Sequence, residues 1–205
     1  MKAVKIPLIS PIGLSRVENH AEIKDELMSL INDAQAERII DKDCQWSLDI
    51  TRCDYTTSVK PETFGDIMDP EWSDQFIERK WVDFLQPHLT PAIDAIYTEM
   101  GYHRFKINKI WFQQYDHGST HGWHAHTDCQ WTSVYYVDLP DDSPRTQILN
   151  PFTQHDIQTL EVQEGDVVCF PSYVIHQAPT NKGDKTKTIV SWNSDADIGP
   201  AYEVQ

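Results

Sequence analysis

The hydrophobic period of the chain changes at Gly101, and this change limits the folds that the second half can adopt. Beyond this glycine, apolar residues occur in short β-branched and aromatic runs that turn-forming residues separate. The runs span residues 105–115, 131–139, 147–149, 159–162, 166–170 and 186–193. Such runs predict strands, and many short strands with these turns are typical of a β-sandwich or jelly roll.

Before Gly101 the spacing of apolar residues is helical. Between Glu18 and Ile40 they recur at steps of three and four, which predicts an amphipathic helix. The stripe consists of Ile23, Leu27, Leu30, Ile31, Ala34 and Ile39. Residues 46–59 alternate and are rich in Thr, Tyr and Val, so they predict a strand pair or an edge strand.

A second helix is expected to begin at Pro70, because proline is favoured in the first turn of a helix. Pro87 and Pro91 are expected to interrupt it, since proline lacks the backbone N–H that a helix interior uses. A further helix would restart at Pro91 and end at Gly101. With these helices packed along one sheet, the fold class is mainly β with N-terminal helices (α+β).

The net charge of −15 comes from 32 acidic and 17 basic residues. A field of this sign repels phosphate backbones and anionic membranes, so nucleic acid is not the expected partner. No apolar run approaches the roughly 18 residues of a membrane helix, and the first residues do not form a signal core. The four cysteines are scattered and expected to be reduced thiols, which predicts a cytoplasmic protein.

Four of the nine histidines lie within ten residues: His117, His121, His124 and His126. If the chain is extended from His124 onward, His124, His126 and Asp128 project from one face, because strand side chains alternate. Imidazole nitrogens and a carboxylate on one face are suitable ligands for a first-row divalent metal. A further ligand is expected from a distant strand, and His176, which follows the run 166–170, is the candidate.

The other histidines are not expected to bind the metal. His117 and His121 would line the mouth of the barrel or face water. The set expected at the surface is His20, His88, His103 and His155.

Six pieces of the second half match one known family in order and spacing. They are Tyr115-x-x-Gly118, His124-x-His126, Ser133-Val-Tyr-Tyr-Val137, Glu164-Gly-Asp-Val-Val-Cys-Phe-Pro171, His176 and Lys187-x-x-x-Ser-Trp-Asn193. In these pieces, which cover about residues 105–195, the chain resembles the non-haem Fe(II), 2-oxoglutarate-dependent oxygenases. It is most similar to small bacterial and phage members with a His-x-His motif.

The resemblance implies a double-stranded β-helix core, which is a cupin-like jelly roll. Residues 105–205 would form this core and carry the metal site. Residues 1–104 would form a helical lead-in with edge strands that packs on the core, so that the whole chain makes one compact unit.

The resemblance leaves two sets of metal ligands open. The family's usual facial triad is His-x-Asp with a distant histidine, which here reads His126-x-Asp128 with His176. Counting from Tyr115 instead places the pair at His124-x-His126. We prefer the second register, which implies a three-histidine site or a helper role for Asp128.

The resemblance also implies 2-oxoglutarate and O₂ as cosubstrates. The far carboxylate of 2-oxoglutarate would need a cation, and Lys187 matches the basic position on the strand after the distant histidine. Ser191 and Asn193 share the face of Lys187 on that strand. Tyr115 and Tyr136 match positions whose hydroxyls help to hold the cosubstrate.

The implied reaction is hydroxylation of an unidentified small-molecule or peptide substrate, with release of succinate and CO₂. Two alternatives stay open: a cupin-like metal dioxygenase that does not use 2-oxoglutarate, and a non-catalytic metal-binding protein. The sequence specifies neither the substrate nor the oligomeric state.

Overall fold

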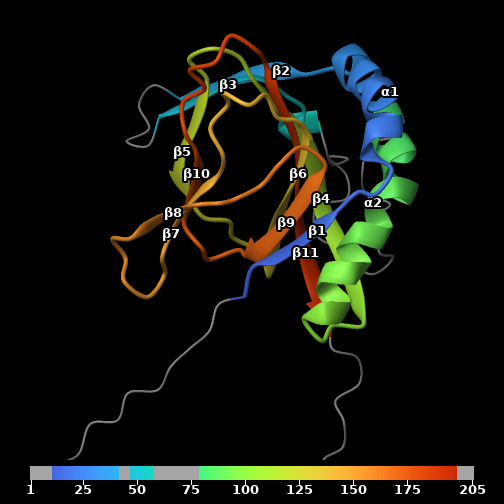
Figure 1. The fold of residues 1–205 in the computed structure, drawn as a ribbon, viewed down its shortest axis with the longest axis vertical. Helices are drawn as coiled ribbons and strands as arrows, with labels where there is room; N and C mark the ends of the chain where they lie inside the picture. Colours follow the sequence, from blue (N-terminus) through green and yellow to red (C-terminus); the bar gives the residue numbers. More distant parts are fainter. Residues whose placement is uncertain (1–10, 42–46, 58–78, 198–205) are drawn as a thin grey trace, which may run out of the picture.

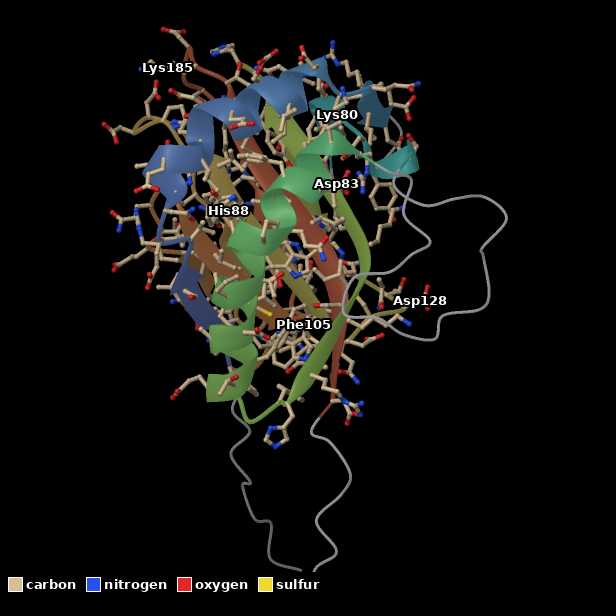
Figure 2. All side chains as sticks on the ribbon, turned by 90° about the vertical axis from the view of Figure 1, so that its right-hand side faces the viewer. Lys80, Asp83, His88, Phe105, Asp128 and Lys185 are labelled. Atoms are coloured by element: carbon tan, nitrogen blue, oxygen red, sulfur yellow. The ribbon has the colours of Figure 1, made fainter. Side chains whose placement is uncertain are left out.

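The computed structural model describes residues 11–41, 47–57 and 79–197. In these residues an antiparallel sheet curls into a half-barrel, and two helices lie along one of its sides (Figure 1). Figure 2 shows the same two helices crossing the outer face of the sheet. This architecture confirms the mainly β fold with helices that precede the core.

The helices are α1 (His20–Asp33) and α2 (Lys80–Glu99), with a short 3₁₀ helix at Tyr55–Thr57. The strands are β1 (Gly13–Arg16), β2 (Glu37–Asp41), β3 (Leu48–Cys53), β4 (Arg104–Tyr115), β5 (Thr120–His124), β6 (Trp131–Asp138), β7 (Gln147–Leu149), β8 (Ile157–Thr159), β9 (Asp166–Pro171), β10 (His176–Ala178) and β11 (Lys187–Asp197). Their order in the sheet is β1-β9-β6-β11-β4-β3-β5-β10-β7-β8, with β2 paired to β3. The first three strands thus join the same sheet as the later ones.

The sheet buries side chains on both faces, which explains the unbroken apolar runs of its central strands. Tyr135 on β6 packs on the helix side with Leu27 and Trp81, whereas its neighbour Tyr136 packs inside the half-barrel with Phe170. Each fully buried side chain of this size contributes on the order of 1.5–3 kcal/mol to folding. The inner cluster forms the walls around the candidate site.

The first helix ends earlier than predicted. α1 stops at Asp33 because Ala34 adopts an extended backbone, and the chain then enters β2. Ile39, which the helical stripe had included, lies on β2 and pairs with Ile50 of β3. Its apolar side chain is half-buried and packs on the inner cluster of the sheet, so the helical spacing was misleading there.

The prediction that Pro87 and Pro91 interrupt the second helix is wrong, because α2 is continuous through both. The two prolines are four residues apart on the exposed face, where water can satisfy the carbonyls that their missing N–H groups leave free. The opposite face, which includes Leu85 and Leu89, is fully buried. The predicted start at Pro70 lies outside the described residues.

The predicted strands in the second half form, and at two of them an end differs from the prediction by more than one residue. β8 begins and ends earlier than the run 159–162, and β11 continues past Asn193 to Asp197. Within residues 46–59 the strand β3 forms, but it lies between β4 and β5 in the sheet and also pairs with β2, so the described residues contain neither an edge strand nor a strand pair within this segment. β1 and β5 were not predicted.

His20 is not a surface residue, contrary to the expectation from sequence. It is 5% exposed, and its Nδ1 lies 2.6 Å from the Tyr135 hydroxyl while its Nε2 lies 3.2 Å from Glu164. These contacts fix the start of α1 to β6. Within the described residues, neither helix is long and apolar enough to cross a membrane.

Asp54 joins the start of α2 to the sheet. Its carboxylate accepts hydrogen bonds from the Arg79 guanidinium, from Trp81 Nε1 at 3.1 Å and from the Phe112 backbone N–H at 2.8 Å. The Asp54 side chain is fully buried, and that of Arg79 is 9% exposed. Such a carboxylate satisfies several buried donors at once.

We predict that Asp54→Ala lowers the free energy of unfolding by about 3–5 kcal/mol, because it leaves a buried guanidinium without its partner. Urea unfolding followed by circular dichroism measures this change. Asp49→Ala, which removes the exposed ion pair with Arg38, serves as the control and should leave stability nearly unchanged. Equal losses in the two variants would contradict the prediction.

Candidate metal centre

Three imidazoles meet where two short strands pair at the mouth of the half-barrel. His124, the last residue of β5, lies directly opposite His176, the first residue of β10. His126 follows two residues later, and its backbone N–H donates to the Ser172 carbonyl at 3.0 Å. The ligand atoms of these three histidines all lie within 4.8 Å of one another.

Backbone carbonyls orient two of the three rings. His124 Nδ1 lies 2.7 Å from the Gly122 carbonyl, and His176 Nδ1 lies 2.9 Å from the Val174 carbonyl. A carbonyl only accepts, so each Nδ1 carries the proton and each Nε2 keeps a free lone pair. This arrangement presents Nε2 as the ligand atom, as outer contacts do in metal sites.

The third ring, that of His126, has a side-chain neighbour instead. The Asn193 side chain hydrogen-bonds to His126 and thereby raises the pKa of His126. Burial has the opposite and larger effect on this pKa. The Trp111 ring also lies nearly parallel to His126, with 6.1 Å between the ring centres. The sequence placed Asn193 with the cosubstrate; in the structure it lies beside a candidate ligand.

Burial keeps all three imidazoles neutral at physiological pH. It lowers the pKa of His126 to about 4, with a smaller contribution from His124, and lowers the pKa of His176 well below its usual value. The pKa of His124 is lowered by burial as well. Since only a neutral imidazole can ligate a metal, the cluster is ready to bind one without losing protons.

Asp128 does not join this cluster. β5 ends at His124, so the extended chain that would place Asp128 on the ligand face does not continue. Asp128 has a left-handed backbone (φ 60°), is exposed, and lies at the outer margin of the molecule (Figure 2). The geometry therefore brings together the His124-x-His126 pair and His176.

His121 stacks face to face on His124, with 3.7 Å between the ring centres and 8° between the planes. Burial lowers the pKa of His121 well below its usual value, so this ring is neutral too. His117 lies apart, on the turn before β5, with Nδ1 3.3 Å from the Gly183 carbonyl. His121 was expected to line the mouth of the barrel or face water, and its direct stacking on a candidate ligand was not predicted.

Behind the histidines lies a narrow inner cavity of about 30 Å³. Its walls include Tyr115, Ser191 and Thr146, and the Tyr136 hydroxyl donates to Thr146 Oγ1 at 2.8 Å. Ser191 Oγ donates to Gln113 Oε1 at 3.2 Å. Gln113 and Thr146 were not singled out from sequence, although Gln113 shares the inward face of β4 with Tyr115.

Lys187 is a buried cation beside this cavity. It is 1% exposed, pairs with Tyr115 across the sheet, and holds its ammonium 5.5 Å from the centre of that tyrosine ring. Nζ donates to the Pro144 carbonyl at 2.8 Å. Among the described residues no carboxylate forms an ion pair with it, and burial, with a smaller contribution from Arg145, lowers the pKa of Lys187 to about 7.

On the other side of the histidines an outer pocket of about 310 Å³ opens between β2, β3 and β4. His121, His124 and His126 line both this pocket and the inner cavity. The imidazole cluster therefore lies between a pocket that a substrate can enter and the inner cavity, whose lining residue Tyr115 contacts Lys187.

Residues 109–193 match the family model described as "Putative 2OG-Fe(II) oxygenase". That description contains the iron and the 2-oxoglutarate that the sequence resemblance implied. A comparison with curated proteins finds no match.

Solved structures share the fold at low identity. A 2OG-Fe(II) oxygenase-family oxidoreductase from Burkholderia pseudomallei is 12% identical, with a TM-score of 0.62 over 85% of this chain and 79% of its own. A Pseudomonas putida prolyl-4-hydroxylase is 13% identical, with a TM-score of 0.56 over 90% and 92%. The epimerase SnoN, solved with Fe³⁺, α-ketoglutarate and nogalamycin RO, is 13% identical, with a TM-score of 0.63 over 94% and 84%.

The matched segment contains all three clustered histidines and Lys187, and its donor set of three neutral imidazoles suits a first-row divalent metal. Residues 109–193 thus match the 2OG-Fe(II) oxygenase family model, in agreement with the sequence resemblance.

Proposed function

We propose that this chain is an Fe(II)- and 2-oxoglutarate-dependent oxygenase that hydroxylates its substrate and releases succinate and CO₂. One observation carries the proposal: three neutral imidazoles lie next to a cavity whose lining residue Tyr115 contacts a buried lysine, Lys187, which has no carboxylate partner among the described residues. The first feature fits a divalent metal and the second fits the far carboxylate of a dicarboxylic acid.

His124, His126 and His176 would hold the metal through their free ring nitrogens. Bound Fe(II) would supply the site at which O₂ reacts with 2-oxoglutarate and an oxygen atom passes to the substrate. The protein's own contribution is to keep the three imidazoles neutral by burial. The backbone carbonyls of Gly122 and Val174 orient two of them, those of His124 and His176.

Lys187 would bind the far carboxylate of 2-oxoglutarate. A buried ammonium that pairs with a carboxylate regains the stabilisation that burial removes. The inner cavity is narrower than 2-oxoglutarate, so binding requires its lining side chains to move apart. Tyr115, Ser191 and the Tyr136–Thr146 pair surround the path and offer hydroxyls to the carboxylate oxygens.

The proposal that the reaction is a hydroxylation rests on the family resemblance and on the prolyl-4-hydroxylase among the similar structures. A cupin-like dioxygenase would consume O₂ without 2-oxoglutarate, and a non-catalytic protein would bind metal without turnover. The buried Lys187 favours the 2-oxoglutarate enzyme, because neither alternative uses a buried cation beside the cavity.

We predict that alanine at His124, His126 or His176 abolishes stoichiometric metal binding, because each imidazole supplies one ligand. Metal content of purified, iron-reconstituted variants measures this. Asp128→Ala is the matched control and should retain the metal. Retained iron in His124→Ala together with loss in Asp128→Ala would show that the other register is correct.

Lys187→Ala should weaken 2-oxoglutarate binding by about tenfold or more and leave metal binding intact, since a charge-assisted contact contributes about 1.5–3 kcal/mol. Isothermal titration of the metal-loaded protein with 2-oxoglutarate measures the change. Lys185→Ala is the control, because Lys185 is exposed at the outer edge of the molecule (Figure 2). Equal affinities in parent and Lys187→Ala would exclude Lys187 as the anchor.

The affinity for 2-oxoglutarate should also depend on pH. Burial lowers the pKa of Lys187 to about 7, so the ammonium form of the free site is depleted about tenfold for each pH unit above that value. Affinity is therefore expected to be constant below pH 7 and to fall as the pH rises above it. Lys187→Arg, which stays charged, should remove the fall; a fall that persists in this variant would assign it to another group.

A further inference from the structure

The outer pocket, which opens directly onto the imidazole cluster, has apolar walls. β2 and β3 contribute Ile39, Leu48 and Ile50, and the opposite wall is formed by Tyr55 and Trp111. The two aromatic rings meet edge to face, with 5.0 Å between their centres. The floor consists of the histidines, and the amides of Gln113 and Asn193, the Thr127 hydroxyl and the Cys53 thiol are further polar groups of the lining.

The charged side chains of the neighbouring strand positions point away from this pocket. Arg38 and Asp49 alternate with Ile39 and with Leu48, so they lie on the opposite face, where they pair with each other at 2.7 Å. None of the described residues that line the pocket is Asp, Glu, Lys or Arg. The alternation of side chains on β2 and β3 therefore places the charged residues on the face that points away from the pocket.

Lys109 is the charged residue on the inward face of β4, two positions before Trp111. It does not line the pocket: its Nζ lies over the Tyr55 ring, 3.2 Å from the ring centre. Tyr55 thus contacts both this ammonium and the Trp111 ring. An anionic group in the pocket would lose its water without gaining a cation among the described lining residues.

We infer that the outer pocket binds a small, uncharged and largely apolar substrate, held against Tyr55 and Trp111 with its reacting carbon toward His124 and His126. Gln113 and Asn193 offer the hydrogen bonds that orient it. A volume of about 310 Å³ is at the small end of the range for ligand pockets. This inference rests on the proposed function, because it assigns the substrate of that reaction.

Three probes that share an indole ring test the inference: neutral indole, anionic indole-3-acetate and cationic tryptamine. Calorimetry on the metal-free full-length protein compares their affinities. Co²⁺-loaded and Zn²⁺-loaded protein then locate bound indole, because paramagnetic Co²⁺ speeds the proton relaxation of a ligand near the histidines. We expect indole to bind more tightly than either charged probe and to relax faster with Co²⁺ than with Zn²⁺.

A charge placed in the wall should reverse this preference. Leu48→Lys is expected to raise the affinity for indole-3-acetate by about tenfold and to weaken indole binding. Asp49→Asn changes the net charge by the same amount on the opposite face of β3 and should change neither. Urea unfolding confirms that both variants are folded.

Tighter binding of a charged probe to the parent, equal responses of Leu48→Lys and Asp49→Asn, or no binding of any probe at millimolar concentration would overturn the inference. Failure to load Co²⁺ would instead contradict the proposed metal site, while calorimetry on the metal-free protein would still decide the probe preference. The two failures are therefore distinguishable.

Discussion

The antiparallel pairing of β5 with β10 is the interaction on which the candidate site depends. It sets His124 opposite His176, although 51 residues of chain lie between them. The Ser172 carbonyl, just before β10, then receives the backbone N–H of His126 and fixes the third ring. Because both strands are short, neighbouring contacts must hold them, and β10 pairs with β7 on its other side while β5 pairs with β3.

The same half-barrel imposes two electrostatic conditions. Its apolar interior keeps the imidazoles neutral, and only neutral imidazoles can bind a metal. The same interior makes the charged form of a lone buried lysine unfavourable, and a carboxylate ligand that pairs with the lysine removes this cost. The hydrogen bond that Lys187 Nζ donates to the Pro144 carbonyl partly offsets the cost of burying this ammonium. The low polarity of the interior thus favours the binding of a metal at the histidines and the binding of an anion at Lys187.

Much of this core could be predicted because its central strands are buried on both faces. β4, β6 and β9 therefore appear as continuous apolar runs, and the His-x-His spacing with His176 identified the cluster.

The local sequence pattern gave wrong predictions where tertiary contacts decide the structure. Ile39 continues a helical stripe but pairs in a sheet, and α2 tolerates Pro91 because that face is exposed. Asp128 alternates with the histidines in sequence, yet its strand has already ended. The division at residue 104, the cytoplasmic location and the roles of the individual site residues stay predictions.

The most direct measurement is an anaerobic titration of the metal-free protein with Fe(II) and 2-oxoglutarate, followed by visible absorption. The account predicts a charge-transfer band that appears only when both are present and saturates at one equivalent of each per chain, since a chelate needs the histidine site and the cosubstrate together. Saturable Fe(II) binding without this band would contradict 2-oxoglutarate as the cosubstrate. Absence of Fe(II) binding would contradict the metal site itself.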